Sequence, residues 1–266
     1  MNLFGRWWAA WTTGREERTL RHRAIPENLW QACLQRYPFI AARNADDLTR
    51  LRRLSTLFLA SKEFSGAGGL EPTDAIALSI AMQACLPVLH LGLSAYDGFI
   101  GIVIHPDEVV AQREVMDGDG VVHQYQETLT GEAMEGGPVM LSWRDVDAAG
   151  ETAEWGYNVV IHEFAHVLDM QDGTADGVPP LPSRAARAHW TRVLTAEYEA
   201  FCDVTARHPD LITVIDPYGA EAPEEFFAVA TEAFFVAAHE MARAHPDLYR
   251  LLRDYFRQDP AATAGA

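Results

Sequence analysis

The spacing of apolar residues predicts a chain built mainly of helices. Between Asp46 and Phe64, leucines and a phenylalanine recur at intervals of three and four residues, which is the period of one helix face. Polar caps, prolines and glycines mark the ends of further apolar stretches. They predict additional helices over residues 26–36, 75–86, 158–170, 183–202, 223–239 and 246–256.

Two short runs break the helical period and predict strands. Residues 98–104 are rich in β-branched side chains and end before Pro106, and residues 139–143 form a second apolar run. The polar, acidic segment 107–137 is expected to carry only a short strand at 121–125. Together these elements predict an α+β fold, mainly helical with a small β-sheet.

Composition narrows the classes of partner and location. A formal net charge of −17 argues against binding to nucleic acid or to an anionic membrane. No run is long and apolar enough for a membrane span, and the tryptophan-rich residues 1–11 lack the order of a signal peptide. Three widely spaced cysteines indicate neither a disulfide framework nor a thiolate metal site. These features predict a cytoplasmic protein.

The candidate chemistry lies in the apolar helix 158–170, which contains His-Glu-x-x-His. His162 and His166 are four residues apart, so they project from one helix face and can reach one metal ion. Glu163 sits beside them, where a carboxylate can take a proton from water without being a ligand. Burying these groups is costly without a metal or polar partners. The alternative is a pair of core histidines hydrogen-bonded to the backbone.

A catalytic zinc ion needs a third protein ligand and one open position. Glu225 is the favoured candidate, because it shares one face of the apolar helix 223–239 with Val229 and Glu232. Metzincins place a histidine six residues after the second motif histidine, but Asp172 occupies that position. Other histidines remain alternative ligands, namely His189, His208, His239 and His245.

The sequence does not decide the roles of two acidic residues. Glu232 either orients a ligand imidazole or is a surface residue. Asp169, one turn beyond His166, is a second candidate for such an orienting role, although aspartates near helix ends often have none.

In these residues the chain resembles the Mlc titration factor A (MtfA) family of gluzincin-like zinc peptidases, from about Pro26 to Pro260. The similarity rests on Leu-Pro-Val-Leu at 86–89, Leu-Gly-Leu at 91–93, Asp-Gly-Phe at 97–99, Gly-Pro-Val at 137–139, and the segments 161–169 and 216–235. It implies a zincin-like fold, in which the small sheet lies beside the helix that carries the histidines.

The resemblance also implies roles for particular residues. His162, His166 and Glu225 would bind one zinc ion per chain, and Glu163 would be the general base. Tyr218 would stabilise the transition state, by local similarity to the lethal-factor catalytic domain, whereas a tyrosine in a Pro-Tyr-Gly turn is otherwise more often structural. The implied activity is that of an aminopeptidase on a peptide or protein substrate. A transcriptional repressor of the Mlc type is the implied partner.

The expected organisation is an aromatic and arginine-rich N-terminal segment (1–25), a peptidase domain (26–260) and a short tail (261–266). Within the domain, a helical part spans about 26–95 and a catalytic part about 96–260. Either predicted strand, 99–104 or 139–143, is expected to offer an edge to an extended substrate. One alternative function is a binding protein that sequesters a transcription regulator, its zinc mainly structural. Another is a peptidase whose cleft is covered by residues 107–137 or by the N-terminal segment.

Overall fold

The structure is a computed structural model that describes residues 14–107, 109–116, 122–129, 131–133 and 136–263. The tryptophan-rich segment 1–11 lies outside the described residues. Among those described, residues 14–22 are helical, and no helix is long and apolar enough to cross a membrane.

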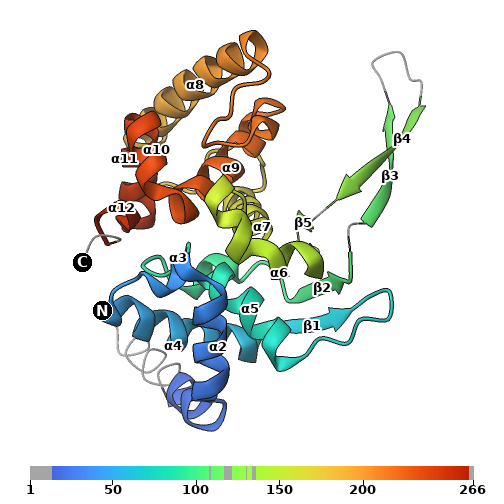
Figure 1. The fold of residues 1–266 in the computed structure, drawn as a ribbon, viewed down its shortest axis with the longest axis vertical. Coiled ribbons are helices and arrows are strands. Elements are labelled where there is room, and N and C mark those ends of the chain that lie inside the picture. The colour runs from blue at the N-terminus through green and yellow to red at the C-terminus, as the bar shows by residue number, and fades with distance from the viewer. Residues whose placement is uncertain (1–13, 108, 117–121, 130, 134–135, 264–266) are drawn as a thin grey trace.

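Helices make up most of the described chain and lie in two groups on either side of α7 (Val159–Asp169). Figure 1 shows the N-terminal group at one end of the molecule and the C-terminal group at the other. The N-terminal group contains α2 (Glu27–Arg36), α3 (Pro38–Ala41), α4 (Ala45–Ser61) and α5 (Asp74–Cys85). The C-terminal group contains α8 (Arg184–Arg207), α9 (Pro223–Val236), α10 (Ala238–Ala244), α11 (Pro246–Phe256) and α12 (Pro260–Thr263). The predicted mainly helical α+β class is confirmed.

A four-stranded sheet, in the order β1-β2-β6-β5, lies beside α7. The strands β1 (Glu63–Gly66), β2 (Gly101–His105) and β6 (Val139–Ser142) are parallel, and β5 (Gly131–Ala133) is antiparallel to β6. The expectation that residues 99–104 or 139–143 offer a free edge is wrong, because β2 and β6 are the two inner strands. The edge beside α7 is β5, whose three residues are too few to give a periodic signal.

The segment between β2 and β5 forms a long hairpin. Strands β3 (Val109–Met116) and β4 (Val122–Leu129) pair antiparallel along their whole length. The predicted short strand at 121–125 was therefore too short, and its partner strand was missed. Figure 1 shows the hairpin projecting away from the helices as a two-stranded ribbon.

Trp143 was predicted to end a strand, but residues 143–152 instead form the helix α6 (Trp143–Thr152). Its first turn is capped by Ser142, whose hydroxyl accepts a hydrogen bond from the Asp145 backbone N–H at 3.4 Å. A short 3-10 turn, η2 (Ala153–Trp155), then leads to α7.

Helix α7 is held at the centre of the core by caps and aromatic packing. The Asn158 side chain accepts a hydrogen bond from the Ile161 backbone N–H at 2.9 Å and so caps the helix. The buried ring of Phe164 packs against Phe58, Tyr96 and Phe99, with ring centroids 4.9 to 5.8 Å apart. Burying such a ring contributes about 1.5–3 kcal/mol, so these contacts fix the helix that carries the histidines.

Candidate metal centre

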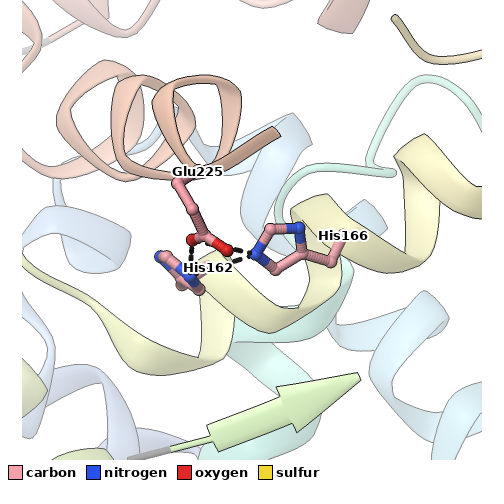
Figure 2. A group of neighbouring side chains, drawn as sticks. All are labelled: His162, His166 and Glu225. Atoms are coloured by element: carbon pink, nitrogen blue, oxygen red, sulfur yellow. Dashed lines mark hydrogen bonds and ion pairs between the residues drawn. The ribbon is translucent and has the colours of Figure 1, made fainter. Parts of the chain in front are cut away.

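Helices α7 and α9 bring three potential ligands to one point. His162 and His166 project from α7 toward Glu225, which lies in the first turn of α9 (Figure 2). The Glu225 Oε2 atom is 3.2 Å from His162 Nε2 and 3.4 Å from His166 Nε2, and the two Nε2 atoms are 3.2 Å apart. One ligand atom from each residue falls within a group no wider than 4.8 Å.

Glu232 determines which ring nitrogen of His162 faces this group. Its carboxylate is buried, with one oxygen 2.7 Å from His162 Nδ1, and its other oxygen accepts a hydrogen bond from the Asn158 backbone N–H. Because a carboxylate only accepts, His162 donates through Nδ1 and directs Nε2 toward Glu225. Glu232 is therefore not a surface residue.

The grouped atoms fit a metal ion by their chemistry. In a neutral His162 with its proton on Nδ1, Nε2 is an acceptor, and it faces the carboxylate of Glu225, which is also an acceptor. Glu225 Oε2 is buried, and no hydrogen bond of adequate geometry reaches it from the described residues. A cation shared by these atoms would satisfy them all. The histidines considered as alternative ligands are not part of this group. His189, for example, is hydrogen-bonded to Arg192, and His245 is hydrogen-bonded to Glu197.

Glu163 lies directly under edge strand β5. Its side chain is 4% exposed, and a Cβ atom at Gly131 would lie 2.5 Å from Glu163 Oε1. Only glycine lets the strand approach so closely, so β5 and the candidate base are fixed against each other.

Tyr218 lies at the rim of the same site. It belongs to the 3-10 turn η4 (Pro217–Ala220), and its ring centroid is 6.2 Å from that of His162. The Asp216 carboxylate accepts a hydrogen bond from the Tyr218 backbone N–H at 2.8 Å and so holds the turn. The side chain is 40% exposed, which leaves it accessible from the solvent side of the centre.

Sequence comparisons identify the family to which this arrangement belongs. The family described as glucose-regulated metallo-peptidase M90 matches residues 11–257. The chain belongs to this metallopeptidase family.

Its relatives include proteins named Mlc titration factor A. The chain is 34% identical over 234 residues to the one from Pectobacterium atrosepticum, covering 88% of this chain and 87% of the relative. The Klebsiella pneumoniae protein of that name is 35% identical, with the same shares. A Synechocystis sp. protein called uncharacterized is 37% identical over 256 residues, 95% of this chain and 90% of its own length. The resemblance inferred from the motifs is confirmed.

Two carboxylates of the M90 metallopeptidase site have pKa values shifted in opposite directions. Burial raises the pKa of Glu225, but the adjacent imidazoles of His162 and His166 outweigh it and bring the pKa down to about 2. Burial raises the pKa of Glu163 above its ordinary value, and the two histidines offset this only in part. Such a divergence suits an ionised ligand beside a proton-accepting base.

Protons and a metal ion would compete for His162. Burial alone would lower the pKa of His162, but the neighbouring carboxylates of Glu225 and Glu232 raise it well above the ordinary value. A metal ion bound at this site would therefore have to displace a proton from the imidazole.

Asp169 contacts the loop that follows α7. Its buried carboxylate accepts a hydrogen bond from the Gly177 backbone N–H at 2.7 Å, and Trp190 Nε1 donates to the Gly177 carbonyl at 2.8 Å. The contacts of Asp169 thus anchor the loop at Gly177, and the orienting role falls to Glu232.

A substitution of Glu232 by glutamine tests its hold on His162. Glutamine keeps the size of the side chain but has one acceptor and one donor, whereas His162 Nδ1 and the Asn158 N–H both donate. We expect the affinity for metal to fall about 10–100-fold, measured by competition with a chelator of known affinity. The exposed Glu240→Gln on α10 is the control. Equal affinity in the two variants would show that His162 is held without Glu232.

Proposed function

We propose that the protein is a zinc-dependent peptidase, and specifically an aminopeptidase. His162, His166 and Glu225 would hold one zinc ion per chain, because two imidazoles and one carboxylate are a donor set of catalytic zinc sites. The observation that carries the proposal is the convergence of these three ligand atoms beside Glu163, within a metallopeptidase family.

When bound, zinc supplies a water of lowered pKa and polarises the peptide carbonyl. Glu163 accepts the proton of the attacking water on its carboxylate and later passes it to the departing amine. The Tyr218 hydroxyl donates a hydrogen bond to the oxygen that becomes negative in the transition state. The edge of β5 offers backbone groups for pairing with an extended substrate.

The function is tested by metal content together with cleavage of matched peptides that carry either a free or a blocked amino terminus. We expect about one zinc ion per chain, and cleavage of the free peptides only. Cleavage of blocked peptides would replace the aminopeptidase assignment by an endopeptidase one. A zinc-loaded protein that cleaves neither series would refute peptidase function and favour the alternative of a binding protein with structural zinc.

Removing the Tyr218 hydroxyl by Tyr218→Phe is expected to reduce kcat about 10²–10³-fold, the usual effect of losing one donor to the oxyanion. Zinc content should be unchanged, because the ring of Tyr218 is not one of the grouped ligands. Kinetics on the free-amine peptide and metal analysis measure the two effects. A variant with the parent kcat would reduce Tyr218 to a structural turn residue.

We also propose a regulatory role through binding of a transcriptional repressor of the Mlc type, which would place the protein in the cytoplasm. The support is the name of the relatives, Mlc titration factor A, at about one-third identity over most of the chain. Calorimetric titration of purified repressor into Glu163→Gln protein tests the role apart from hydrolysis. Undetectable binding at micromolar concentrations would contradict it.

A further inference from the structure

A cavity of about 380 Å³ lies at the far end of edge strand β5. Val167 lines it from α7, and Met170 lines it from the 3-10 turn that follows, η3 (Met170–Asp172). Val139 lines it from β6, and Phe99 lines it from the segment before β2. None of the ten described residues that line it has a charged side chain, although the chain as a whole carries a formal charge of −17. Small apolar cavities with few polar groups are the usual form of a ligand subsite.

Helix α7 and strand β5 both connect the wall of the cavity to the candidate catalytic residues. Glu163 and Val167 are four residues apart and share one face of α7, and Met170 follows three residues later, just past the end of the helix. Glu163 lies against Gly131, the first residue of β5. Ala133, the last residue of β5, pairs with Val139 in the wall of the cavity.

The distance between Glu163 and the cavity-lining Val167 matches the length of one or two substrate residues. Val167 lies about 6 Å along the helix axis from Glu163, at about 1.5 Å per residue. An extended peptide advances about 3.4 Å per residue. A peptide that pairs antiparallel with β5, the more stable pairing, runs from Ala133 toward Gly131. Its residues on the amino side of the cleaved bond therefore lie next to the cavity.

We propose that this cavity receives an apolar side chain from the first or second residue on the amino side of the cleaved bond, and so selects the substrate. The inference rests on the proposed peptidase function. In an aminopeptidase, the selected residue is the one that carries the free amine.

The test compares leucine with glycine at these two substrate positions, in the parent protein and in Ala95→Phe, which places a ring in the cavity. We expect the parent to favour leucine at least about 10-fold in kcat/KM, since a few methylene groups in an apolar pocket discriminate about 10–200-fold. In Ala95→Phe the ratio should fall toward about 1. The exposed Ala188→Phe on α8 is the matched control and should keep the parent ratio.

Gly98→Leu is a second filling variant in case Ala95→Phe does not fold, because a Cβ atom at Gly98 meets no other atom within 4 Å. A binding measurement removes the dependence on turnover. Zinc-loaded Glu163→Gln is titrated with leucine hydroxamate and glycine hydroxamate, both with a free amine, with and without the filling substitution. We expect leucine to bind more tightly, and the filling variant to abolish the difference.

The possible outcomes distinguish failure of the proposed role of the cavity from failure of the proposed peptidase function. A protein that hydrolyses peptides without an amino-side preference, or a filling variant that keeps the preference, overturns the role of the cavity and leaves the proposed function standing. A preference that appears only on the carboxyl side of the bond also overturns it. A protein that binds no metal and hydrolyses nothing overturns the proposed function, and the role of the cavity falls with it.

Discussion

Replacing Glu163 by glutamine is expected to leave metal bound and to reduce peptide hydrolysis by about 10²–10⁴-fold, the usual contribution of a positioned general base. Glutamine has nearly the shape of glutamate but cannot accept the proton of the attacking water. The close contact of Glu163 with Gly131 makes this isosteric change suitable, because a larger or branched side chain would push β5 away. Kinetics and metal analysis on the same protein sample measure both effects.

The exposed Glu151 on α6 gives the control Glu151→Gln, which removes one negative charge outside the group of candidate ligands. It should keep the parent rate and metal content. Undiminished hydrolysis by Glu163→Gln would move the base to another residue.

Replacing Glu225 by alanine is expected to empty the metal site. Loss of even a hydrogen-bond partner of a ligand typically weakens metal binding about 10–100-fold, so loss of the ligand itself should weaken it by more than about 100-fold. Glu225→Ala also removes the only carboxylate in the group formed with His162 and His166. Zinc per chain after dialysis against a weak chelator, with peptide hydrolysis, measures the loss.

Glu224→Ala changes the adjacent residue of the same helical turn and is the matched control. It should retain the metal. If Glu225→Ala held as much zinc as this control, the third ligand would have to be another residue.

Strongly periodic segments could be predicted from the sequence nearly residue by residue. The helix predicted at 246–256 is α11, and those predicted at 46–64 and 75–86 are α4 and α5 with shifts of a few residues. Helices α4 and α11 have an apolar stripe, α5 is apolar and buried on nearly all sides, and each has a recognisable end, so local and tertiary preferences agree. The helix with the two histidines was predicted to begin at 158, and it begins at Val159, with Asn158 as its cap.

Elements shaped by close tertiary contact could not be predicted in this way. Gly150 lies inside α6, where a Cβ atom would come within 2.0 Å of the Arg36 carbonyl oxygen. The glycine is there because α6 packs against the end of α2, and no local pattern reports that approach. Strands β1 and β5 also could not be recognised in the sequence. Each is short and is defined only by its pairing with one neighbouring strand.

Some features of the candidate site could likewise be predicted from the sequence, and others could not. The spacing of His162 and His166 follows from helix geometry alone, so their convergence could be predicted. The role of Glu232 could not be decided, because its burial depends on α9 packing against α7 and on the Asn158 N–H. Asn158 itself donates to Gln83 Oε1 at 2.7 Å and links the group to α5, a contact between helices far apart in the sequence.

The assembly of the three ligands from two helices has a consequence for the abundance of the protein. An unfolded chain keeps His162 and His166 near each other, but Glu225 joins them only when α9 docks on α7. A metal ion held by the three residues would therefore bind the native form preferentially, and each tenfold rise in free metal above its dissociation constant would add about 1.4 kcal/mol to the free energy of unfolding. Metal starvation would then expose the chain to degradation, so that supply of the ion governs how much protein persists as well as how fast it works.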